Sequence, residues 1–141
     1  MKDTLRPGIA HTMRYEVPAE RTVPHLLPEA SDFGSMPEVL ATGYMVGIIE
    51  WACMEALRDH LDDSELSLGV HVDLSHDAPT LPGSTVIIDV TVTEVDGRAV
   101  TFDVAARDEH AVISTGTHRR GVVDRDRFAA RLARQAEGAQ R

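Results

Sequence analysis

The sequence predicts an α+β fold, in which an antiparallel sheet wraps around one long central helix and a further helix ends the chain. Two observations support this prediction. One long apolar segment occupies the middle of the chain, and consecutive segments with alternating apolar and polar residues follow it, separated by short turns. Alternation is typical of strands with one buried face, and short turns make neighbouring strands antiparallel. A sheet with one apolar face must cover a helix to bury that face.

The central helix is expected from about Met36 to Leu61, which is nearly 40 Å at ~1.5 Å per residue. Ser35 is followed three residues later by Glu38, a capping-box signature, and Pro37 falls in the first turn. The middle of this segment is apolar on almost every side. Helices of that kind are buried within a domain rather than laid along its surface.

Strands are predicted over residues 69–78, 84–95, 99–108 and 110–124, with a weaker candidate over residues 8–17 that a Pro- and His-rich loop follows. Each predicted inner face consists of every second residue: Val70, Val72, Leu74 and His76; Val86, Ile88, Val90 and Val92; Val100, Phe102, Val104 and Ala106. Pro82-Gly83 and Asp96-Gly97 supply turns. The terminal helix is expected to begin after Asp124, a possible N-cap.

This order of elements is the pattern of a hot-dog fold, in which the helix lies in the curve of the sheet and pairs of subunits usually join their sheets edge to edge. The chain has 141 residues, the size of one ordinary domain. It shows neither an internal repeat nor a linker between two composition regimes. We therefore expect a single domain over residues 1–141.

The charge balance bears on partners and location. The chain carries 14 Lys and Arg against 23 Asp and Glu, a formal net charge of -9. Such a surface repels phosphate at long range, which argues against nucleic acid and anionic membranes as main partners. The longest uncharged run, Val39 to Ile49, is far shorter than the ~20 residues of a transmembrane helix, and the N-terminus lacks a signal-peptide apolar region. A single cysteine, Cys53, excludes an internal disulfide framework and favours a reducing cytoplasm.

Glu50 is the first candidate functional residue, because it lies among apolar neighbours in the middle of the predicted helix. A buried carboxylate without partners is costly, so it is normally paired, hydrogen-bonded or protonated. The alternative is that Glu50 faces a solvent-filled gap or a dimer interface where a donor satisfies it. His76 is the second candidate: alternation places its ring inward, where it is either a satisfied structural residue or an acid and base beside a carboxylate.

Thr42 is the third candidate, a hydroxyl one to two turns into the same helix. Eight residues separate Thr42 from Glu50, so the two lie on adjoining faces about 12 Å apart along the axis and cannot hydrogen-bond directly. The alternative for Thr42 is packing or a bond to a backbone carbonyl.

Other sites are less favoured by the sequence. Cys53 is interpreted as a packed core residue, since no histidine lies at helical spacing from it. No metal site is expected, because the histidines lack a zinc arrangement and His71 and His76 face opposite ways. No P-loop or Rossmann glycine pattern is present, and no cofactor is predicted. His118, Arg119 and Arg120 form a basic cluster that is either solvated surface or suited to a phosphate-bearing ligand.

Three segments together carry a resemblance that covers nearly the whole chain: TVPHLLPEASDFGSMPEVLATGYMVGIIEWACMEAL, SLGVHVDLSHDAPTLPGSTV and STGTHRR. They strongly resemble the fluoroacetyl-CoA thioesterase family of hot-dog enzymes. The resemblance implies a homodimeric acyl-CoA hydrolase whose catalytic residues are Thr42, Glu50 and His76. These are the three residues that the patterns above also single out.

The same resemblance implies a set of substrate-binding residues. Gly69 would offer a backbone contact and Arg120 would help to hold the substrate, while Phe33, Met36 and Val39 would line the acyl pocket. Where this chain has Met36, the characterised family enzyme has a Phe that gates the pocket. A Met is slimmer and more flexible, so the selection for a fluoromethyl group is expected to be relaxed or achieved differently.

Thioester hydrolysis needs a nucleophile, a proton donor for the leaving thiolate and donors for the oxyanion. We expect Glu50 to attack the carbonyl or activate water, Thr42 to orient the acyl group and the carboxylate, and His76 to act as general acid and base. The family also suggests that His76 takes an alpha proton that fluorine has acidified. The alternatives are a thioesterase for another small acyl group, on CoA or a carrier protein, and a non-catalytic hot-dog protein that binds an acyl or aromatic ligand.

Overall fold

A computed structural model describes residues 1–139 and confirms the predicted hot-dog architecture. The strands are β1 (Ala10–Glu16), β2 (Glu65–Leu74), β3 (Thr85–Asp96), β4 (Ala99–Arg107) and β5 (Val112–Asp124). The α-helices are α1 (Ser31–Gly34), α2 (Thr42–Leu57) and α3 (Arg125–Ala139), and the short 3-10 turns are η1 (Ala19–Arg21), η2 (Val23–His25) and η3 (Arg58–His60). Within this part of the chain, no helix is both long and apolar enough to cross a membrane.

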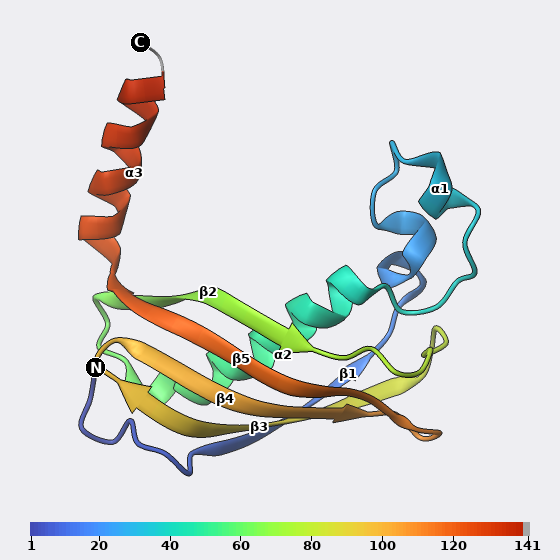
Figure 1. The fold of residues 1–141 in the computed structure, drawn as a ribbon, viewed down its shortest axis with the longest axis horizontal. Coiled ribbons are helices and arrows are strands. Elements are labelled where there is room, and N and C mark those ends of the chain that lie inside the picture. The colour runs from blue at the N-terminus through green and yellow to red at the C-terminus, as the bar shows by residue number, and fades with distance from the viewer. Residues whose placement is uncertain (140–141) are drawn as a thin grey trace.

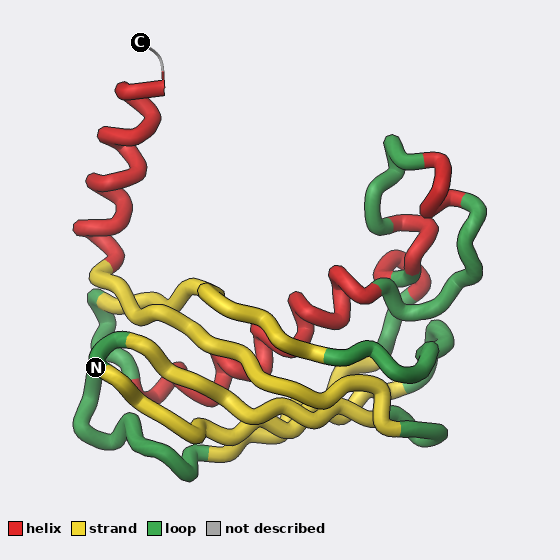
Figure 2. Tube along the Cα trace, viewed as in Figure 1, coloured by secondary structure: helices red, strands yellow, loops and turns green. Residues whose placement is uncertain are grey.

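The five strands form one antiparallel sheet in the order β1-β3-β4-β5-β2. The sheet curls around α2, which runs along its concave side (Figures 1 and 2). β1 and β2, the first and second strands in the sequence, form the two edges, so the later three strands make up the centre. The weak strand candidate at the N-terminus is therefore a full edge strand.

The predicted alternation is confirmed in β3 and β4, two of the three central strands. Their inward residues are at most 5% exposed: Val86, Ile88, Val90, Val92, Val100, Phe102, Val104 and Ala106. The same core contains most of α2, including Met45, Ile49 and Leu57. At 20–33 cal/mol per Å², burial of such side chains is the main force that holds the sheet on the helix.

The start of the central helix differs from the prediction. Ser35 and Glu38 do not form a capping box; α2 begins at Thr42, and Ala41 precedes it without a side-chain cap. The segment before the helix is held by backbone bonds to distant residues: Leu40 N–H donates to the Thr80 carbonyl, and Ala41 N–H donates to the Arg21 carbonyl. These bonds take the backbone groups that a longer helix would need. The helix also ends earlier, at Leu57 rather than Leu61.

The second predicted strand also differs, because β2 lies at an edge and contains a β-bulge. Its register against β5 shifts between Gly69 and His71, which leaves Val70 as the extra residue. Val70 and Val72 are 57% and 46% exposed rather than buried, since no further strand covers this edge. β2 ends at Leu74, so His76 lies in the following loop and not on the strand.

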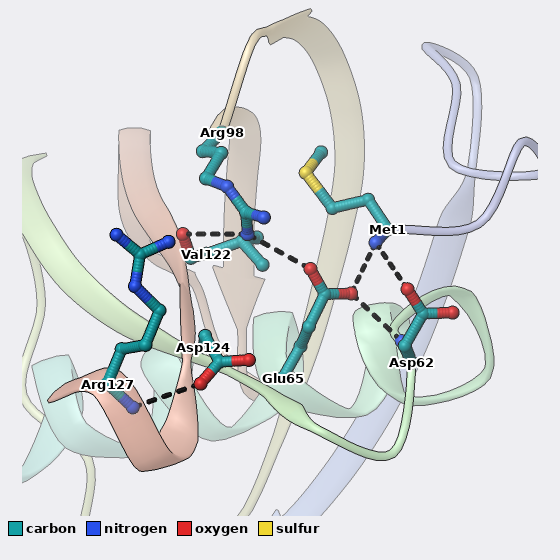
Figure 3. Close-up of polar contacts among 7 residues, drawn as sticks. All are labelled: Met1, Asp62, Glu65, Arg98, Val122, Asp124 and Arg127. Atoms are coloured by element: carbon teal, nitrogen blue, oxygen red, sulfur yellow. Dashed lines mark hydrogen bonds and ion pairs between the residues drawn. The ribbon is translucent and has the colours of Figure 1, made fainter. Parts of the chain in front are cut away.

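Two parts of the chain extend beyond the sheet, one at each end (Figure 1). The segment between β1 and α2, which contains α1, rises at one end, and α3 projects at the other. The predicted N-cap of α3 is confirmed, since Asp124 accepts a hydrogen bond from the backbone N–H of Arg127 at 3.0 Å. At the base of α3, Glu65 contacts Arg98 and the Met1 ammonium group (Figure 3).

Candidate active site

Thr42 and His76 form the more exposed part of the site. Thr42 is the first residue of α2, not one to two turns inside it, and it is exposed. Its Oγ1 lies 2.7 Å from His76 Nδ1, a hydrogen-bond distance. Residues 40 and 41 set the start of the helix, and the loop after β2 carries the histidine, so the pair joins two segments 34 residues apart.

The other ring nitrogen of His76, Nε2, is buried and has no hydrogen-bond partner in the protein. Burial lowers the pKa of His76, and the charge of Asp77 raises it back in part. The ring is therefore biased toward its neutral form at neutral pH. A neutral imidazole with one nitrogen held and the other unpaired can accept a proton from a bound molecule or bind its donor group.

A pocket of about 260 Å³ adjoins this pair. Its lining consists of the η2 region, the start of α2 and the loop after β2: Val23, Val39, Leu40, Thr42, His76, Asp77, Ala78 and Pro79. Val39, one of the three predicted acyl-pocket residues, lines it. Phe33 and Met36 are not among its lining residues, and Met36 is 49% exposed.

Glu50 lies farther along α2 and is paired with a cation. Its Oε1 is 3.5 Å from Arg120 Nη1 and 3.8 Å from His118 Nε2, and its side chain is 37% exposed. The carboxylate is thus neither unpaired in the core nor free in solvent. Its cationic partner offsets the free-energy cost of placing a carboxylate among apolar residues. Its open side can face a ligand.

Gly69 on β2 lies directly over the Glu50 carboxylate. A Cβ atom at position 69 would be 2.2 Å from Glu50 Oε1 and 3.3 Å from His118 Cε1. Only glycine leaves this space for the carboxylate. The structure therefore brings Gly69, Glu50 and Arg120 together.

Arg120 is 3% exposed, and each of its three guanidinium nitrogens contacts a protein group. Its Nε donates to Ser67 Oγ at 2.8 Å, its Nη2 donates to the Ser67 carbonyl at 2.9 Å, and its Nη1 lies 3.2 Å from His118 Nε2. Burial lowers the pKa of Arg120, and the Glu50 carboxylate raises it again. Arginine nevertheless keeps its charge in proteins.

The predicted basic cluster is not a surface patch. His118 and Arg120 point inward and are buried, whereas Arg119 between them is exposed on the other face. Alternation along β5 separates the three side chains.

Cys53 is fully buried, as interpreted from the sequence, and burial raises the pKa of its thiol to about 12. Cys53 therefore stays protonated and is no nucleophile.

Sequence reasoning missed one residue of this site, Ser67, and named His118 only as a member of the basic cluster and not as a partner of Arg120 and Glu50. The available signal was the spacing: polar Glu65 and Ser67 lie on one face of β2, as His118 and Arg120 lie on one face of β5. Polar residues at inward positions of adjacent strands indicate a buried polar network.

Within residues 1–139, no group of three or more His, Cys, Asp and Glu side chains is arranged to hold a metal ion.

Comparison with known proteins places the chain in a family. The model of the fluoroacetyl-CoA-specific thioesterase family matches residues 22–126. The fluoroacetyl-CoA thioesterase of Streptantibioticus cattleyicolor is 42% identical over 132 residues, which cover 94% of this chain and 95% of that protein.

Solved structures agree with the sequence comparison. A structure of the fluoroacetyl-CoA thioesterase FlK superposes with a TM-score of 0.91 at 40% identity, over 94% of this chain and 98% of that one. A phenylalanine-to-alanine mutant of FlK in complex with fluoroacetate and CoA gives a TM-score of 0.86 at 41% identity, over 88% and 99%. The resemblance noted from the sequence is confirmed: the chain belongs to the fluoroacetyl-CoA-specific thioesterase family.

Proposed function

We propose that this protein hydrolyses fluoroacetyl-CoA to fluoroacetate and CoA. The family supports the reaction, and one observation in the structure carries the proposal. His76 presents a buried, unpartnered nitrogen beside a pocket, with the Thr42 hydroxyl 2.7 Å from its other nitrogen. Such an arrangement suits an acid and base that serves a bound acyl group.

In the proposed reaction Glu50 acts on the thioester carbonyl carbon, either directly or by taking a proton from water that attacks. The neutral His76 ring first takes up a proton from solvent. When the C–S bond breaks, the ring gives that proton to the CoA thiolate and is neutral again. On the direct path, a mixed anhydride between Glu50 and the acyl group forms and water hydrolyses it. Thr42 orients the acyl group at the start of α2. Arg120 Nη1 lies 3.5 Å from Glu50 Oε1, which places a positive charge beside the carboxylate on either path.

His76 has a second proposed role, as the base that removes a proton from the carbon bearing fluorine. Fluorine acidifies that carbon, so a non-fluorinated acetyl group would not lose its proton as readily. The lowered pKa of His76 supports this role, because the neutral ring is the form that accepts a proton.

A specific observation favours a second candidate, a thioesterase with a broader range of short acyl groups. The family enzyme has a gating Phe where this chain has Met36, and Met36 is 49% exposed and outside the pocket lining. A flexible side chain in that position closes the pocket less tightly than an aromatic ring.

We also propose that the active form is a homodimer in the cytoplasm, joined through the β2 edge. Val70 and Val72 on β2 are 57% and 46% exposed, and Trp51 and Met54 on α2 are 47% and 46% exposed. An unpaired edge with apolar neighbours is a surface that a second copy can cover. Light scattering of the wild type and Val70→Asp tests it: the wild type should have the mass of two chains and the variant that of one.

The function is tested with purified protein and a panel of thioesters. kcat/KM for fluoroacetyl-CoA should exceed that for acetyl-CoA by at least tenfold if the first candidate holds. Similar values for acetyl-CoA and longer short-chain thioesters would support the broader enzyme. Tight binding of these compounds without any turnover would contradict both and support a binding protein. Met36→Phe should increase the preference for fluoroacetyl-CoA.

A further inference from the structure

We infer that His118 is a positioning residue, a neutral hydrogen-bond acceptor that fixes the Arg120 guanidinium against the Glu50 carboxylate. The inference rests on the proposed role of Glu50 in hydrolysis. His118 itself is completely buried, and both of its ring nitrogens are engaged by the protein. It therefore acts through Arg120 rather than on the substrate.

The partners of His118 decide which nitrogen carries the proton. Nδ1 lies 2.8 Å from the backbone carbonyl of His71, and a carbonyl can only accept, so Nδ1 must be protonated. Nε2 lies 3.2 Å from Arg120 Nη1, and a guanidinium can only donate, so Nε2 must be unprotonated. Only the neutral Nδ1–H tautomer satisfies both contacts. Burial also lowers the pKa of His118, which favours the same neutral form.

This tautomer completes the set of contacts that holds Arg120. Ser67 takes the Nε and Nη2 hydrogens on one side, and His118 takes a hydrogen from Nη1. Nη1 is also the atom 3.5 Å from Glu50 Oε1. A planar guanidinium held at three nitrogens has little freedom to rotate, so its charge is directed at the carboxylate.

The β-bulge in β2 connects this network to the backbone over Glu50. The register shift lies between Gly69, which lies against the carboxylate, and His71, whose carbonyl lies at His118. Bulges are enriched beside active sites because they redirect groups on one strand.

Three variants test the inference in the full chain. His118→Phe keeps an aromatic ring at this position but cannot accept from Arg120, and it should lower kcat about tenfold while KM stays within twofold. His118→Gln can still accept a hydrogen bond and should recover most of that loss. Val90→Ala, in the core of β3, is the control for lost stability, since it should lower the melting temperature without lowering kcat. Equal losses in all three variants at equal stability would overturn the inference.

A double-mutant cycle with Glu50→Gln locates the effect. If His118 acts through the Arg120–Glu50 pair, His118→Phe should cost less than twofold more in the Glu50→Gln background. A full tenfold cost in that background would contradict the inference.

A spectroscopic readout separates this inference from the proposed function. The ¹⁵N chemical shifts of His118 in the wild type should show the neutral Nδ1–H tautomer at every pH from 5.5 to 8. Protonation of His118 in that range, or the Nε2–H tautomer, would overturn the inference whatever the enzyme hydrolyses. An inactive wild type with the expected tautomer would contradict only the proposed function.

Discussion

The candidate site has two parts that differ in how completely their polar groups are satisfied. Around Thr42 and His76, at the end of α2, one imidazole nitrogen has no partner and a pocket adjoins it. Around Glu50, in the middle of α2, the buried Arg120 uses all three of its nitrogens on protein groups. The first part can bind something new, whereas the second is already complete apart from the open side of the carboxylate.

The difference suits the two parts to different tasks: one can bind a ligand, and the other holds a charge in place. An unsatisfied buried nitrogen is costly in the free protein, and a ligand that pairs with it recovers that cost. A network with every partner in place holds a charge in a set position before any ligand arrives, which is the preorganisation that catalysis needs. About 12 Å of helix axis separates Thr42 from Glu50.

The largest effect on activity is expected when the negative charge of Glu50 is removed. Glu50→Gln should lower kcat/KM about 10³-fold, because the amide neither attacks the thioester nor takes a proton from water. The fold should persist, since the amide oxygen still accepts from Arg120. Glu55→Gln is the matched control, a glutamate on the same helix that contacts His11 instead. Steady-state hydrolysis checks both, and near-normal activity of the Glu50 variant would refute its assignment.

The next largest effect on activity is expected from a substitution of His76. His76→Ala should lower kcat/KM about 10²-fold, the lower end of what a general acid and base contributes. Its pocket should still bind CoA thioesters, so KM should change little. The control is His110→Ala, since His110 is an exposed histidine on the loop before β5. If the two alanine variants had equal activity, His76 would not be part of the reaction.

A smaller effect is expected from the space over Glu50. Gly69→Ala places a Cβ only 2.2 Å from Glu50 Oε1, so the carboxylate must shift from its present position. We expect a loss of about tenfold in kcat with little loss of stability, because the atom displaced is the end of a flexible side chain. Gly121→Ala is the control, since its Cβ would make only an ordinary 3.4 Å contact with Val70. Normal turnover by Gly69→Ala would show that the carboxylate position is not critical.

The smallest effect is a dependence of stability on pH. Burial lowers the pKa of both His76 and His118 in the folded protein. The pKa of a histidine in the unfolded chain is about 6.5, so below that pH the unfolded chain binds more protons than the folded one. The free energy of unfolding should be fully retained above that pH and should fall as the pH drops below it. Urea denaturation at pH 7.5 and 5.5 measures the fall, which should be smaller in His118→Gln. An equal fall in that variant would exclude His118 as a source.

Part of the site could be predicted from the sequence because its signal was local. Glu50 is conspicuous among apolar neighbours, and His76 and Thr42 also emerge from the same patterns. What spacing could not reveal was the partner of each residue. Ser67 and His118 are ordinary polar residues in alternating strands until the β2–β5 register places them at one guanidinium.

The sequence by itself determined the order of elements, the buried faces of β3 and β4 and the cap of α3, because alternation and capping act between residues close in the chain. Tertiary structure alone decided that α2 begins at Thr42, since backbone bonds from residues 40 and 41 to Thr80 and Arg21 replace the local cap. It also decided the bulge at Val70 and the ion pair of Glu50 with Arg120. These features depend on hydrogen bonds and charges between segments far apart in the chain, which no local pattern encodes.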